Sequence, residues 1–159
     1  MPARITLIGA LFAALAAVPA AAQTKEDPLV ARGRYLMKTA GCNDCHTPGY
    51  MEKGGQVPES EWLKGDKLAW NGPWGTTFAP NLRLYFEAMS EEEWLRKAKN
   101  LSTRPPMPWF NVRAMTTTDQ RAIYRYARTL KPSGEPAPAY LPPDQTPPKP
   151  AMVFQLPGK

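Results

Sequence analysis

The stretch Cys42-Asn43-Asp44-Cys45-His46 decides the predicted fold of this chain, because it has the spacing Cys-x-x-Cys-His. Two thiols separated by two residues can each add to one vinyl group of a haem, and the adjacent His then lies under the ring. The chain has 2 Cys and 1 His in 159 residues, so one haem would use all three. The motif predicts one haem c held covalently by Cys42 and Cys45, with His46 as the proximal iron ligand.

Three other kinds of site use a Cys-x-x-Cys spacing. A thioredoxin-type redox pair is expected in a strand–helix setting, and no strand is predicted before Cys42. A structural zinc site needs four ligands, and the chain has no second cluster of ligands to complete one. A structural disulfide between Cys42 and Cys45 stays open. The His directly after the second Cys favours haem over these alternatives.

The N-terminal residues have the layout of a secretory signal peptide. A single cation, Arg4, precedes an apolar stretch from Ile5 to Val18, and small residues at 20–22 offer a cleavage site. The apolar stretch is too short to span a bilayer as a helix, which leaves an uncleaved interfacial anchor as the alternative. We expect residues 1–22 to be a signal peptide, with no stable membrane span elsewhere. The expected location is the periplasm, an oxidising compartment in which cysteine cross-links persist.

Beyond the signal peptide, residues 23–131 are predicted to form one haem-binding domain and residues 132–159 a Pro-rich tail. The tail holds nine prolines, which exclude a regular helix or a central strand. Such a tail is extended, either as an arm that binds a partner or as a segment that is disordered or wraps the domain. Four apolar side chains could attach it to the domain: Tyr140, Leu141, Val153 and Phe154.

Capping signals predict three helices in the domain. The first has Asp27 as its N-cap and ends at Gly41, directly before the haem motif. The second begins at Ser90, with Glu93 completing a capping box. The third begins near Thr117, with Gln120 as the reciprocal capping partner, and stops before the proline at 132.

Between the first two helices, residues 47–89 show no sustained strand alternation. A structureless run of this length is unusual in a compact domain. A large flat cofactor explains it, because irregular loops can fold around a haem as their core, and a domain of this size otherwise has a thin core.

The iron of such a haem needs a sixth ligand, and no second His is available. A thioether sulfur is the natural alternative, and His/Met ligation raises the reduction potential. Met107 lies in Arg104-Pro105-Pro106-Met107-Pro108-Trp109, where prolines limit the entropy of the loop. We therefore predict Met107 as the distal ligand. The alternative is a surface methionine packed on Trp109.

The order of these features resembles the class I cytochrome c family. A helix with Gly33 precedes the haem motif, a Met-Pro loop follows, and the last helix reads Ala122-Ile123-Tyr124-Arg125-Tyr126-Ala127. The resemblance covers about residues 27–131. It implies an all-α, cytochrome c-like fold, with three to four helices and long loops around one covalently bound haem. It also implies a close crossing of the first and last helices, with Gly33 against Tyr126.

The stretch Gly75–Leu82, the helix after Ser90 and the Pro-Met-Pro loop are similar to haem domains in the cytochrome subunits of periplasmic alcohol and aldehyde dehydrogenases. Those subunits carry several haem motifs, whereas this chain has one. The resemblance implies that residues 76–82 line the haem. Four residues are candidates to bond a propionate: Trp70, Trp74, Asn81 and Arg104.

The expected function is that of a periplasmic one-electron carrier between a dehydrogenase and a respiratory acceptor, an oxidase or another cytochrome. Such a protein catalyses no substrate chemistry of its own. Two alternatives stay open. One is a haem protein with a labile sixth ligand that acts as a gas or peroxide-reactive enzyme or sensor. The other is a docking subunit that uses its tail to sit in a dehydrogenase complex.

The formal net charge of +6 is compatible with an anionic partner surface or with solubility alone. The cations are scattered, so no nucleic-acid partner is expected. Five of them gather around the last predicted helix, where they form either a basic face or an ordinary solvated one: Arg113, Arg121, Arg125, Arg128 and Lys131.

Overall fold

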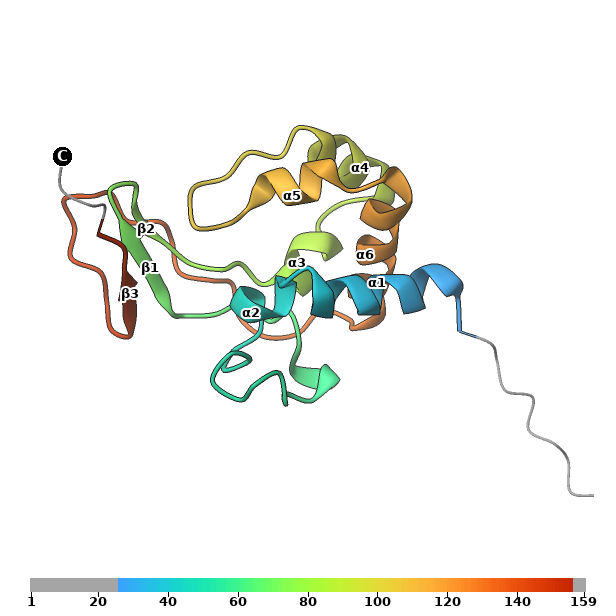
Figure 1. Cartoon of the computed structure of the whole chain (residues 1–159), viewed down its shortest axis with the longest axis horizontal. Helices are drawn as coiled ribbons and strands as arrows, with labels where there is room; N and C mark the ends of the chain where they lie inside the picture. The colour runs from blue at the N-terminus through green and yellow to red at the C-terminus, as the bar shows by residue number, and fades with distance from the viewer. Residues whose placement is uncertain (1–25, 156–159) are drawn as a thin grey trace, which may run out of the picture.

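The structure, a computed structural model, describes residues 26–155. The predicted signal peptide, residues 1–22, lies outside the described residues. Helices form a body at one end of the molecule, and a small sheet extends from it at the other (Figure 1). The elements are α1 Pro28–Thr39, α2 Cys42–His46, 3-10 helix η1 Glu59–Glu61, β1 Ala69–Gly72, β2 Gly75–Thr77, α3 Leu82–Glu87, α4 Glu91–Lys99, α5 Trp109–Ala114, α6 Thr117–Thr129 and β3 Ala151–Val153.

The prediction of an all-α fold with three to four helices is wrong, because residues 26–155 contain six α-helices and a three-stranded mixed sheet. Strand β1 is central, with β2 antiparallel on one side and β3 parallel on the other. Each strand has only three or four residues, too few to show a period of two. Strand β3 also comes from the Pro-rich tail. It is an edge strand, where flanking prolines are tolerated.

The three helices predicted from capping signals are present. Asp27 caps α1 by accepting a hydrogen bond from the backbone N–H of Leu29. Ser90 and Glu93 form the capping box of α4. The reciprocal role assigned to Gln120 is wrong. The N-cap of α6 is Thr116, one residue earlier, so its N3 residue is Asp119, and the buried Gln120 amide donates instead to the Val112 carbonyl.

The interface between α1 and α6 is the most extensive contact between two elements (Figure 1). Gly33 is buried there, and a Cβ built on it would lie 2.1 Å from the Ala122 carbonyl oxygen and 2.6 Å from the Tyr126 Cβ. The expected contact of Gly33 with Tyr126 is therefore confirmed. Only glycine lets the two backbones approach this closely, and the crossing sets the direction in which α1 delivers the chain to α2.

Arg83 on α3 holds the loop before the sheet against the end of α6. Its side chain is buried, with 5 % exposed, and its guanidinium donates to the carbonyls of Trp62, Ser60 and Leu130. Buried polar groups stabilise a fold only when they are hydrogen-bonded. Arg83 meets that condition and fixes three segments at once.

The suggested basic face around α6 is largely neutralised. Arg121 and Arg125 both donate to the Glu91 carboxylate of α4, at 2.6 and 2.9 Å. Arg128 pairs with Glu87 at the end of α3. These ion pairs tie α6 to its neighbouring helices, so three of the five cations that we grouped there are already partnered.

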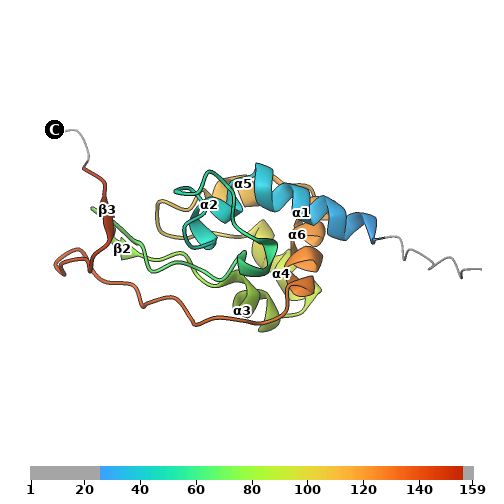
Figure 2. The same cartoon turned by 90° about the horizontal axis from the view of Figure 1, so that it is seen from below.

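Tail residues 132–155 run back along the molecule from the end of α6 past α3 to the sheet (Figure 2). The side chain of Asn81 donates to the Ser133 carbonyl at 2.8 Å. Leu141 forms a bridge with Thr76, and the Phe154 ring stacks on Trp70 with centroids 6.0 Å apart. Of the two open alternatives, the structure therefore matches a wrap around the domain.

Replacing Gly33 by Ala is expected to destabilise the protein by about 2–3 kcal/mol, because overpacking a tight contact forces the two helices apart. Gly54→Ala is the control. Its new Cβ meets nothing within 4 Å, and only its positive φ of 56° opposes the change, at a cost of about 1 kcal/mol. Denaturant unfolding of both variants measures the difference. Equal stability of the two variants would contradict the close crossing of α1 and α6.

Replacing Glu91 by Gln is expected to cause a modest, pH-dependent loss of stability. Hydrogen bonds from Arg125 and then Arg121 lower the pKa of Glu91 in the folded protein. The stabilisation is therefore present above the unfolded-state pKa and is lost as the pH falls through the folded-state value. Unfolding of the variant and wild type at neutral and acidic pH should show a difference that vanishes in acid. Glu92→Gln, which removes no ion pair of the described residues, should show none.

Candidate functional site

Helix α2 is a single short turn that presents the Cys-x-x-Cys-His motif. Gly41, with a φ of 73°, turns the chain from the end of α1 into α2, a conformation that favours glycine. Cys42, Cys45 and His46 then face a cavity of about 380 Å³. This volume lies within the usual range of small-molecule and cofactor sites.

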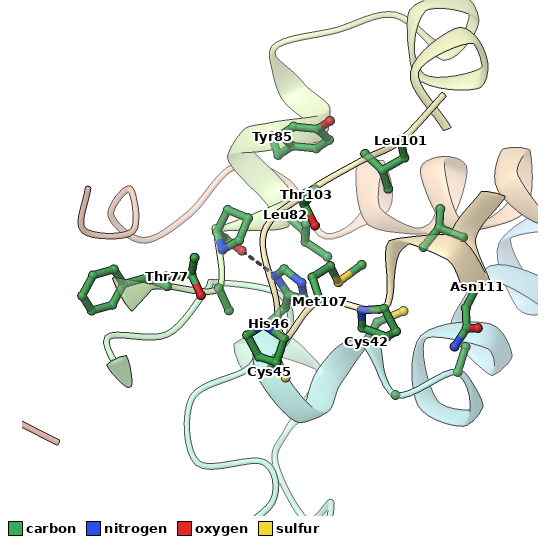
Figure 3. Close-up of a pocket in the computed structure, with 18 of the residues that line it drawn as sticks. Cys42, Cys45, His46, Thr77, Leu82, Tyr85, Leu101, Thr103, Met107 and Asn111 are labelled. Carbon is green, nitrogen blue, oxygen red and sulfur yellow. Dashed lines mark hydrogen bonds between the residues drawn. The ribbon is translucent and has the colours of Figure 1, made fainter. Parts of the chain in front are cut away.

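The walls of this cavity come from many separate parts of the chain. Helix α2, residues 77–82, the loop 101–108, helix α5 and the tail around Tyr140 contribute, and further residues of α1, β1, α3, α4 and α6 complete the lining. Most of the lining side chains are apolar. All four predicted site residues, Cys42, Cys45, His46 and Met107, line this one cavity (Figure 3). Residues 65 positions apart in sequence are thus brought together.

His46 is fixed in one tautomer. Its Nδ1 lies 2.8 Å from the Pro80 carbonyl oxygen, which can only accept, so Nδ1 carries the proton and Nε2 keeps its lone pair (Figure 3). Burial lowers the pKa of His46, with the Pro80 hydrogen bond opposing that shift. The imidazole is therefore neutral at neutral pH. A neutral His whose second nitrogen is held by a carbonyl is the usual form of a metal ligand.

The two cysteines are partly buried, and their thiol pKa values are shifted in the direction opposite to that of a reactive redox pair. The pKa of the Cys42 thiol is raised to about 11, mainly by burial. Burial also raises the pKa of the Cys45 thiol. Reactive Cys-x-x-Cys pairs have lowered thiol pKa values. Both thiols are free, not joined in a disulfide. No three His, Cys, Asp or Glu side chains within residues 26–155 are grouped to hold a metal ion by themselves, so the zinc alternative gains no support.

Met107 reaches the cavity from the loop that precedes α5 (Figure 3). The Thr77 hydroxyl donates to the Pro105 carbonyl at 2.8 Å, which fastens this loop to β2. Met107 is partly buried against the hydrophobic core, rather than lying on the surface. Met37 and Met115 also line the cavity, whereas Met51, Met89 and Met152 do not.

Hydrogen bonds behind the motif hold α2 in place. The buried Thr47 hydroxyl donates to the Asn43 side-chain oxygen at 2.8 Å and accepts from the Leu63 backbone N–H at 2.8 Å. The His46 carbonyl accepts from Gly65 N–H at 2.9 Å. Sequence analysis missed Thr47. A hydroxyl directly after the motif was the only available signal.

The residues suggested to bond a propionate divide into two pairs. Trp70 and Arg104 line the cavity, whereas Trp74 and Asn81 do not. Asn81 is buried, and its side chain is already used in capping α3 and binding Ser133. Five residues of the stretch 76–82 line the cavity: Thr77, Phe78, Ala79, Pro80 and Leu82.

Two tail residues, Pro138 and Tyr140, also line the cavity, which the sequence did not predict. Tail contacts of this kind depend on the long-range pairing of Leu141 with Thr76. No local pattern encodes that pairing.

No family model, curated protein or solved structure matches the chain. In the described part of the chain, residues 26–155, no helix is both long and apolar enough to cross a membrane.

Replacing Thr47 by Val is expected to destabilise the protein by about 2–3 kcal/mol, because it leaves the buried Leu63 N–H without an acceptor and removes the donor to Asn43. The matched control is Thr39→Val, whose exposed hydroxyl bonds only the Tyr35 carbonyl. We expect the control to stay within about 0.5 kcal/mol of wild type. Equilibrium unfolding compares the two, and equal effects would show that Thr47 does not anchor the motif.

Proposed function

We propose that this chain is a class I c-type cytochrome, a one-electron carrier with one covalently attached haem. The observation that carries the proposal is the arrangement around His46. A neutral imidazole, fixed by Pro80, shares one apolar cavity with two free thiols and a thioether. This donor set fits haem c, since it offers two groups for the vinyl carbons and one nitrogen and one sulfur for the iron.

Haem c bound in this cavity supplies a one-electron couple and two carboxylates. Cys42 and Cys45 would hold it covalently, and His46 and Met107 would be the proximal and distal iron ligands. The hydrogen bond to Pro80 keeps the His46 ring oriented and keeps its donor nitrogen unprotonated. The prolines that flank Met107 and the hydrogen bond from Thr77 to the Pro105 carbonyl keep Met107 in position. Fixed ligands and apolar walls favour electron transfer, because little reorganises when the charge changes.

We also propose that the partners are redox proteins, a dehydrogenase as donor and an oxidase or another cytochrome as acceptor. Encounters of this kind bury small surfaces and depend on salt. The proposed location is the periplasm, supported by the signal-peptide layout and by the Cys-x-x-Cys-His spacing, which is typical of exported proteins with covalently attached haem. No observation favours an open sixth position over a bound Met107.

The test is the absorption spectrum of protein produced with a c-haem maturation system. We expect a low-spin c-type spectrum in both oxidation states, a weak long-wavelength band from iron–sulfur charge transfer, and no binding of carbon monoxide. In Met107→Ala the band should disappear and carbon monoxide should bind, because the sixth position loses its sulfur.

Met115→Ala is the matched control. Met115 lines the same cavity, but it follows α5 in the sequence, whereas Met107 precedes it. It should keep the band and exclude carbon monoxide. A wild-type protein that is high-spin and binds carbon monoxide readily would contradict Met107 ligation. That result would favour a gas or peroxide-reactive haem protein instead.

A further inference from the structure

Arg104 has an unusual position at the rim of the cavity. Among the described residues that line the cavity it is the only Lys, Arg, Asp or Glu. No carboxylate of residues 26–155 forms a salt bridge with it. The cations on α6, by contrast, are paired with Glu87 and Glu91. The structure thus leaves one positive charge without a counter-ion at the edge of an otherwise apolar site.

The tail holds this guanidinium in place. The Arg104 Cζ atom lies 3.8 Å from the centroid of the Tyr140 ring, a close cation–π contact. The Tyr140 hydroxyl in turn donates to the Trp74 carbonyl at 2.9 Å, which fixes the ring against the turn between β1 and β2. An exposed arginine normally samples many rotamers, so this stacking reduces the entropy that it loses on binding a ligand.

The backbone around Tyr140 is equally fixed. Thr76 and Leu141 exchange two backbone hydrogen bonds, of 2.8 and 3.0 Å. Gly75 lies beneath them with a φ of 93°, and a Cβ there would lie 2.4 Å from the Leu141 carbonyl oxygen. Glycine at this position lets the tail approach the sheet. The tail is therefore positioned as a wall of the cavity and not as a free arm.

We propose that Arg104 binds a propionate carboxylate of the haem, and that Tyr140 is the positioning residue through which the tail sets the reduction potential of the site. The inference rests on the proposed function. A guanidinium recognises a carboxylate through two parallel N–H donors, which suits a propionate at the rim. Its charge keeps the propionate ionised and favours the reduced, less positive site.

The experiment measures the midpoint potential of the full-length holoprotein and its dependence on pH. In Arg104→Gln we expect a lower potential, because the cation is removed and the propionate charge is uncompensated. We also expect a stronger pH dependence, because the propionate now takes up a proton on reduction. Tyr140→Leu should shift both properties in the same direction by a smaller amount.

Two controls separate this role from a general effect of charge or stability. Arg113→Gln removes the same charge elsewhere. The Arg113 Cζ atom also lies over an aromatic ring, 5.3 Å from the Trp109 centroid, but Arg113 does not line the cavity. It should leave the pH dependence unchanged. Tyr140→Phe keeps the ring over Arg104, although it loses the hydrogen bond to Trp74. Because the ring contact is kept and only its fastening is lost, the potential and its pH dependence should both lie between those of wild type and Tyr140→Leu.

The outcomes distinguish a failure of the propionate contact from a failure of the proposed function. If Arg104→Gln matches Arg113→Gln in potential and pH dependence, while both retain a low-spin haem c spectrum, the propionate contact is overturned and the proposed function stands. If Arg104→Gln behaves as expected but Tyr140→Leu matches wild type, the positioning role of the tail is overturned. A wild-type chain that attaches no haem overturns the proposed function, and this inference with it.

Discussion

The hydrogen bond between His46 Nδ1 and the Pro80 carbonyl joins α2 to the segment between β2 and α3. His46 lies at the end of α2, which follows directly from α1, and Pro80 lies in the segment that leads from β2 into α3. The α1–α6 crossing at Gly33 determines where α2 begins, and the Thr47 hydroxyl holds α2 from behind. Because His46 and Pro80 are both held in place, the imidazole has one orientation, and its second nitrogen, Nε2, is left to the apolar cavity.

The small sheet at the far end of the molecule completes that cavity. Strand β2 is tied to the Met107 loop through Thr77, and β1 contributes Trp70 to the lining. In the tail, Tyr140 and Leu141 first form the wall of the cavity next to Arg104. Strand β3 follows and pairs with the edge of β1. A chain segment that would lack regular structure alone is stabilised here by pairing with three parts of the domain. The tail is therefore part of the candidate site, because two of its residues line the cavity.

Local signals singled out residues that the structure brings to one cavity, whereas the fold class predicted from them was wrong. The Cys-x-x-Cys-His spacing, the capping residues Asp27 and Ser90 and the Pro-flanked Met107 each depend on neighbouring residues, so sequence alone could identify them. The sheet could not be predicted, because its strands are short and β3 lies more than 70 positions from β1. The same holds for Tyr140, whose place in the cavity depends on the bridge to Thr76.

The central claim is that Cys42 and Cys45 bind one haem covalently. The most direct test is the intact mass of the chain under denaturing conditions, after production with a c-haem maturation system and export. We expect the mass to increase by that of one haem, and we expect no increase in the double variant Cys42→Ser, Cys45→Ser. An unmodified chain, or a haem that is lost on denaturation, would contradict the claim.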